Sequence, residues 1–216
     1  MAHLVGRSSS KGGIPVDIIR ESVRRLEEQI HGSGSEDGIV TIDTDPNTVI
    51  CQYERGACLR AQYGGRSAEF VTSEPIIATT RISFMFGASL EKLPQRAAAC
   101  AILNVATGFF CLSRALKACE PEKHKDCLSA LKREIGHGRI YPVGMTSNAT
   151  APFENVVINP EEADIIVVVG DGLIDPGTGN LIALYTGKKR ILFLSPSTAG
   201  VSALTGCSHW CPYGRG

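Results

Sequence analysis

The stretch ADIIVVVGDGLIDPGTGNLIALYTGKKRILFLS, residues 163–195, decides the fold. It begins with an unbroken β-branched run at residues 165–169 and ends with a second apolar run at residues 191–194. Strands that are apolar along their whole length are typical of a parallel sheet covered on both faces. The segment at residues 178–187 has the composition of a helix and connects the two runs. We therefore predict an α/β domain with a Rossmann-like parallel sheet over residues 91–216.

The first 90 residues have a different pattern, which predicts an α+β region. Apolar residues recur at spacings of three and four from Ile19 to Ile30, and Pro15 suits the first turn of such a helix. From residue 39 to residue 86 the period changes to two, with turn residues between short runs. This alternation predicts an antiparallel meander that includes a strand at residues 48–53.

Two further helices are expected between these regions. One begins at Pro94 and continues to about Cys119, and the next begins at Pro121 and ends at Gly136. The first contains the most apolar run, residues 97–112, which is shorter than the roughly 20 strongly apolar residues that a membrane span needs. We expect this run to be a buried helix, and we expect no membrane association.

Charge and cysteine content narrow the classes of function. Lys plus Arg and Asp plus Glu both number 22 in 216 residues, so no net field favours nucleic acid as a partner. The chain has eight cysteines but is not a small, cysteine-dense scaffold, and its first residues contain no apolar leader. These features predict a cytoplasmic protein with free thiols. The sequence leaves open whether it forms a homo-oligomer.

The ends of the predicted parallel strands are the expected ligand site, because loops and helix N-termini converge there. The sequence offers two polar turns at this edge, one rich in glycine and one rich in hydroxyl groups. Ordinary turn formation and helix capping would explain the same residues. The candidate ligand-binding residues are Gly170, Asp171, Gly172, Ser195, Ser197 and Thr198.

The most specific chemical signal is the Cys-x-His-x-Cys cluster formed by Cys207, His209 and Cys211. Two thiolates and an imidazole are suitable ligands for zinc, iron or another transition metal, or for a metallocofactor. A redox thiol pair and a packed tail without chemistry are the alternatives. For Cys51, Cys58, Cys119 and Cys127 we expect structural positions in strands and helices, since their spacing matches no recognised metal motif.

Residues 97–204 resemble the Rossmann-like heavy-metal-chelation domain family. The resemblance is carried by Asn104 in AILNVA, by the loop around Gly170, Gly177 and Thr178, and by the Pro196-Ser197-Thr198 turn. Ser195 stands where that family has a glycine. The resemblance implies a Rossmann-like fold, a preceding domain similar to the N-terminal domain of enolase, and a link with metals.

These observations support three hypotheses. The first is a protein that binds a metal or metallocofactor through Cys207, His209 and Cys211, with Ser197 and Thr198 holding an anionic part of the ligand. The second is an enzyme that acts on a nucleotide or an S-adenosylmethionine-like ligand at the same strand ends. The third is a structural or assembly partner. No pair of general acid and base can be assembled from the sequence, so catalytic residues are not assigned.

Overall fold

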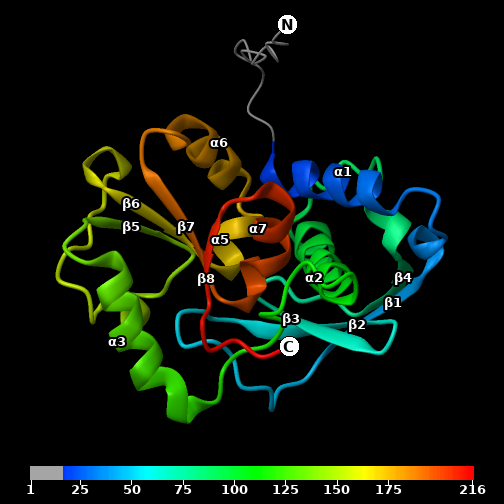
Figure 1. Ribbon diagram of the computed structural model, residues 1–216, viewed down its shortest axis with the longest axis horizontal. Helices are drawn as coiled ribbons and strands as arrows, with labels where there is room; N and C mark the ends of the chain where they lie inside the picture. The colour runs from blue at the N-terminus through cyan, green and yellow to red at the C-terminus, as the bar shows by residue number, and fades with distance from the viewer. Residues whose placement is uncertain (1–16) are drawn as a thin grey trace, which may run out of the picture.

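The computed structural model describes residues 17–216, which form two four-stranded sheets with helices packed between and around them (Figure 1). In chain order the helices and strands are α1 (Ile18–Ile30), β1 (Ile39–Thr44), β2 (Ala57–Tyr63), β3 (Arg66–Thr72), β4 (Ala78–Arg81), α2 (Leu93–Phe109), α3 (His124–Ile135), β5 (Ile140–Val143), α4 (Ser147–Thr150), β6 (Ile165–Val168), α5 (Gly170–Ile174), α6 (Pro176–Tyr185), β7 (Arg190–Leu194), α7 (Ala199–Thr205) and β8 (Ser208–Trp210). Five short 3-10 turns occur between them: η1 (Ser35–Asp37), η2 (Ile82–Met85), η3 (Pro121–Lys123), η4 (Pro160–Glu162) and η5 (Pro196–Thr198).

Helix α1 confirms the amphipathic helix that the apolar spacing predicts. Asp17 caps its N-terminus by accepting hydrogen bonds from the main-chain amides of Ile19 and Arg20. Its apolar face, from Ile19 to Ile30, is buried, and its charged face carries Glu–Arg pairs. Pro15, which we expected in the first turn, lies outside the described residues.

The antiparallel sheet has the order β3-β2-β1-β4, so β1 to β3 form a meander and β4 pairs with the other edge of β1. The predicted strand at residues 48–53 is wrong. This segment is irregular and closes a turn in which the Glu54 amide donates to the Cys51 carbonyl at 3.0 Å. Cys51 and Tyr53 instead pack into an apolar cluster with side chains of the second sheet, and this long-range burial replaces strand pairing.

The second sheet is parallel throughout, with the order β5-β6-β7-β8 (Figure 1). The predicted strands at β6 and β7 and the connecting helix α6 are confirmed. Residues 170–180, which we expected to form a loop, instead form α5 and the start of α6. Asp175 and Pro176 explain this difference, because the Asp175 carboxylate accepts from the Gly177 amide and Pro176 is at the first helical position.

Helix α2 ends at Phe109, ten residues before the predicted end near Cys119. Cys111 adopts φ of +58°, and the amides of Leu112 and Ser113 donate back to the Thr107 carbonyl. This αL termination satisfies a carbonyl in the last turn and redirects the chain. Residues 115–118 then run beside the C-terminal segment, where Lys117 and Arg215 form a β-bridge.

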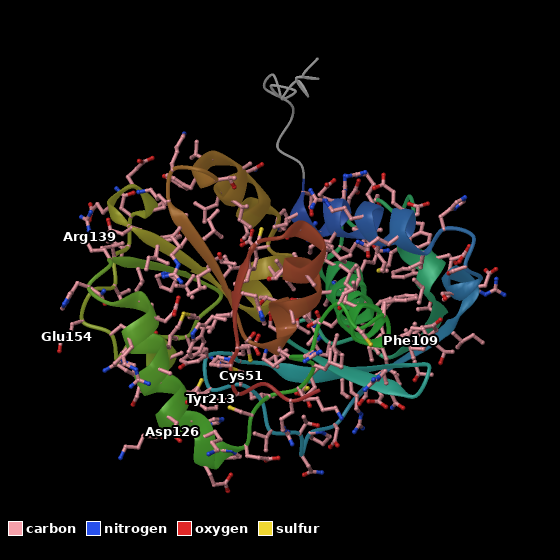
Figure 2. All side chains as sticks on the ribbon, in the orientation of Figure 1. Cys51, Phe109, Asp126, Arg139, Glu154 and Tyr213 are labelled. Carbon is pink, nitrogen blue, oxygen red and sulfur yellow. The ribbon has the colours of Figure 1, made fainter. Side chains whose placement is uncertain are left out.

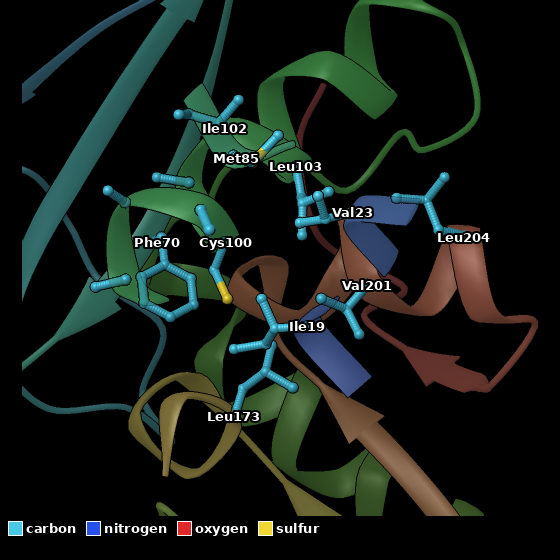
Figure 3. Close-up of a cluster of buried hydrophobic side chains, with 14 of the residues drawn as sticks. Ile19, Val23, Phe70, Met85, Cys100, Ile102, Leu103, Leu173, Val201 and Leu204 are labelled. Carbon is cyan, nitrogen blue, oxygen red and sulfur yellow. The ribbon is translucent and has the colours of Figure 1, made fainter. Parts of the chain in front are cut away.

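Helix α2 is the central element of the main core, between the antiparallel sheet and the rest of the molecule (Figure 1). Figure 3 shows side chains of this core, which come from α1, β3, α2 and α7 and include Ile19, Phe70, Leu103 and Val201. A second apolar cluster lies on the opposite face of the parallel sheet, beneath α3. The two clusters explain why β6 and β7 are apolar along their whole length.

Within residues 17–216, no helix combines the length and the apolar character needed to cross a bilayer.

Candidate functional site

A buried carboxylate from the first half of the chain lies at the carboxyl ends of β6 and β7. Glu54 Oε1 accepts hydrogen bonds from the Gly170 amide at 3.0 Å and from Ser195 Oγ at 2.7 Å. Gly170 and Ser195 are two of the residues that we expected to bind an external ligand. In the structure they bind an anionic group that belongs to the chain itself.

Burial raises the pKa of Glu54 to about 7, because the charged form loses its hydration. Hydrogen bonds from Ser195, Ser197 and Gly170 favour the charged form and oppose this shift. Glu54 therefore titrates near neutral pH. No sequence motif marks it, since it lies in an irregular segment far from the parallel strands.

The other predicted ligand-binding residues also make contacts inside the fold. Ser197 Oγ accepts from the Val71 amide at 2.9 Å, and the Asp171 carboxylate accepts from the Ser73 amide. Thr198 Oγ1 lies 3.1 Å from the carbonyl oxygen of Leu194 and donates within its own turn. The turns after β6 and β7 thus connect the parallel sheet to β3 and the segment that follows it.

The glycines of the first turn allow close packing of main chain against main chain. A Cβ atom on Gly170 would lie 2.5 Å from the Val71 carbonyl oxygen and 2.8 Å from Glu54 Oε1. A Cβ atom on Gly172 would lie 2.3 Å from the Val143 carbonyl oxygen. Both positions therefore require glycine because of close packing inside the protein, and no bound ligand is needed to explain them.

Ser195 holds a strained main-chain conformation at the centre of this site. Its φ is +85°, a region that favours glycine, and its side chain is buried against Glu54. Its carbonyl oxygen lies 2.9 Å from His209 Nε2. A carbonyl oxygen only accepts, so Nε2 carries the hydrogen. Ser195, Glu54 and His209 do not form a catalytic triad, because the imidazole contacts the Ser195 main chain and not its hydroxyl group.

The structure places Cys207, His209 and Cys211 along one open groove, but their side chains do not converge on a point where they could bind one metal ion. Strand β8 ends at Trp210, so Cys211 lies beyond the strand, where the chain turns and the Gly214 amide donates to the Cys211 carbonyl. Among residues 17–216, no three His, Cys, Asp or Glu side chains are arranged so that they could hold one ion.

Cys211 instead joins three other cysteines around a very small cavity of about 10 Å³, which is close to the space of one water molecule. Cys51, Cys119 and Cys127 come from the irregular segment before β2, the loop before α3, and α3 itself. The Tyr53 hydroxyl lies 3.6 Å from the Cys127 thiol and closes one side. Figure 2 marks this region by Cys51 and Tyr213, both of which line the cavity. We call this cavity, which is lined by Cys51, Cys119, Cys127 and Cys211, the thiol cavity.

All eight cysteines lie within residues 17–216 and none forms a disulfide bond. Burial raises the pKa of the Cys51, Cys119 and Cys127 thiols and raises that of Cys211 to about 12. These thiols are therefore protonated at neutral pH. This protonation is unfavourable for a redox pair, which requires a stabilised thiolate.

The sequence predicts Cys211 as a metal ligand but gives only structural roles to the three cysteines that lie around the same cavity. Cys51, Cys119 and Cys127 are buried, as expected for structural positions. Their convergence has no signal in their spacing, because it depends on the turn at residues 51–54 and on the early end of α2.

The chain matches no protein-family model, no curated protein and no solved structure. The resemblance to the heavy-metal-chelation family therefore stays a prediction.

Proposed function

We propose that the protein binds a soft metal ion or a small metal–sulfur cofactor at the thiol cavity, through Cys51, Cys119, Cys127 and Cys211. The observation that supports this proposal is the convergence of four cysteines from four separate segments on one cavity. Half of the eight cysteines in the chain meet at this point.

The chemistry of the donors favours a thiophilic guest. Four thiolates form the ligand set of structural zinc sites and of iron–sulfur clusters. The rest of the cavity lining is mostly apolar or aromatic and includes Leu194, Pro196 and Trp210. Such a lining excludes water and offers no oxygen-rich shell, which disfavours magnesium and calcium.

Binding would convert thiols to thiolates with release of protons to the solvent. The raised thiol pKa values describe the metal-free protein, and a bound cation favours the thiolate form. No three thiols are already within reach of one ion. Binding of a single ion would therefore require the thiols to move inward, and a metal–sulfur cofactor would also require the cavity of about 10 Å³ to widen.

Elemental analysis tests this proposal on the full chain purified without oxygen. We expect about one equivalent of zinc, or iron together with acid-labile sulfide, in the unmodified protein. The variants Cys51→Ser and Cys211→Ser should lose most of this metal. The exposed Cys111→Ser and the buried Cys58→Ala are matched controls, and both should retain it.

Two results would contradict the proposal. One is equal, substoichiometric metal in the unmodified protein and in both cavity variants. The other is full metal content that survives in Cys51→Ser and Cys211→Ser when circular dichroism shows that both variants are folded.

A further inference from the structure

The open groove beside the thiol cavity is lined by the remaining members of the Cys-x-His-x-Cys cluster. Cys207, His209 and Cys211 all line it, and its other side is formed by the segment around Arg114 and by α7. Cys207 and His209 flank the exposed Ser208 on β8, so strand alternation puts them on the same face. Cys207 and Cys211 are partly exposed, whereas Cys51 and Cys127 are each only 6% exposed.

Cys211 is the one cysteine that lines both the groove and the cavity. It lies just after β8, at the point where the chain turns toward α3 and the buried thiols. A ligand atom at this position can contact a guest on either side. The two spaces are therefore connected by a side chain with metal-binding chemistry.

The hydrogen bond between His209 Nε2 and the Ser195 carbonyl fixes the orientation of the imidazole. In the neutral ring this bond leaves the lone pair on Nδ1. Histidine ligands commonly donate their other N–H group to a main-chain carbonyl in this way. His209 is thus prepared to act as a nitrogen ligand from the groove.

The groove also contains a buried polar atom without a partner. Ser202 Oγ, on α7, is buried and makes no hydrogen bond with the described residues, and Ser202 lines the groove. Buried hydroxyl groups in native proteins nearly always have a partner. Ser202 therefore adds a polar side chain to the wall of the groove.

We infer that the groove is an entry site, where Cys207 and His209 first bind the metal before Cys211 transfers it to the thiol cavity. This inference rests on the proposed function, and it adds a second, transient metal site and a direction of transfer. Cys207 is partly exposed beside the groove, whereas the cavity thiols Cys51 and Cys127 are too buried to meet an ion directly from solution.

The transfer is a ligand exchange without oxidation or reduction. Each thiol that binds the ion loses one proton to the solvent as its sulfur–metal bond forms. When Cys51, Cys119 or Cys127 replaces a groove ligand, the metal–Cys207 bond breaks and the released thiolate takes up one proton. Cys211 binds the ion before Cys207 and His209 release it, so the ion passes to the cavity without release to solvent.

Rapid mixing of the reduced, metal-free full chain with Cd²⁺ tests the inference, because cadmium–thiolate bonds absorb in the ultraviolet. We expect Cys207→Ser and His209→Gln to slow the absorbance rise by about tenfold or more, because each variant lacks one of the two ligands that bind the ion first. Both should reach the same final Cd²⁺ content as the unmodified chain. Glutamine can still donate to the Ser195 carbonyl, so His209→Gln removes the ligand and keeps that contact. Ser208→Ala, on the opposite face of β8, is the control and should load normally.

The outcomes separate the two proposals. Loading at the normal rate in folded Cys207→Ser and His209→Gln would overturn the entry site and leave the thiol cavity intact. An equal loss of final content in Cys207→Ser and Cys51→Ser would place Cys207 in the final site, which also overturns the transfer. An unmodified chain that retains no Cd²⁺ after gel filtration would instead contradict the proposed function. Cys207→Ala provides a second variant if serine disturbs packing against α7.

Discussion

At the scale of single residues, buried polar side chains connect the antiparallel sheet to the parallel sheet. Asn104 on α2 donates to the carbonyl oxygens of Glu69, Pro196 and Ser197, and its own oxygen accepts from the Gly200 amide. Its side chain is fully buried. One amide therefore connects α2, β3 and the turn after β7, which no apolar residue could do.

Replacing Asn104 should cost more stability than a comparable apolar change on the same helix. Asn104→Leu would leave several main-chain groups without partners in a region closed to water, which predicts a loss of ~2–4 kcal/mol in the free energy of unfolding. Ile102→Val, two residues away on the same buried helix, should cost about 1 kcal/mol. Urea unfolding of both variants measures the difference. Equal losses would show that the hydrogen bonds of Asn104 are energetically unimportant.

Ser195 permits a sharper test, because strain and hydrogen bonding act there in opposite directions. Ser195→Ala loses the bond to Glu54 and keeps a Cβ atom at φ of +85°. Ser195→Gly loses the same bond but relieves the main chain. Glycine should therefore be the more stable variant by ~1 kcal/mol, the reverse of the usual order of these residues. Thermal unfolding of the pair decides this, and a more stable alanine variant would argue against strain.

At the scale of elements, α5 is fitted directly against the end of β5. Gly172→Ala would bring a Cβ atom to 2.3 Å from the Val143 carbonyl oxygen, so one of the two main-chain segments must move. We expect a loss of ~2–4 kcal/mol in unfolding free energy. Gly206→Ala is the matched control: it ends α7 at φ of +71° with open space around it, and should cost only about 1 kcal/mol. Similar losses at both positions in denaturant unfolding would contradict the close packing.

The elements that were predictable from sequence are those with a strong local pattern. The apolar periodicity of α1 and the unbroken runs of β6 and β7 each indicate one structure, and each is present. The elements that were missed depend on distant contacts. The segment at residues 48–53 alternates like a strand, but its Glu54 end is held by Gly170 and Ser195, more than 100 residues away.

The candidate site follows the same division. Cys211 belongs to a local motif and was predicted as a ligand, whereas Cys51, Cys119 and Cys127 are distant in sequence and were expected to be structural. Glu54 was not considered, because a single glutamate in an irregular segment has no distinguishing pattern. Sites assembled from several segments require the fold before their members can be named.

At the scale of the whole molecule, Glu54 makes the contact between the segment before β2 and the ends of β6 and β7 sensitive to pH. The folded pKa of about 7 is above the ordinary value of 4.5, so the folded state binds this proton more tightly than the unfolded state does. The favourable contribution is fully present below pH 4.5 and is lost as pH rises through 7. The 2.5-unit difference corresponds to at most ~3 kcal/mol of unfolding free energy.

Glu54→Gln should remove this dependence, because glutamine stays neutral and can still accept from the Gly170 amide. We expect the variant to match the unmodified protein near pH 5 and to gain stability relative to it at pH 8, measured by urea unfolding across that range. His209, whose pKa is lowered by burial, adds the opposite trend at acidic pH, but both proteins share it. The exposed Glu122→Gln is the control and should follow the unmodified protein at every pH. If the difference between Glu54→Gln and the unmodified protein is constant from pH 5 to pH 8, Glu54 does not change its protonation state in this range, and the predicted pH dependence of this contact is wrong.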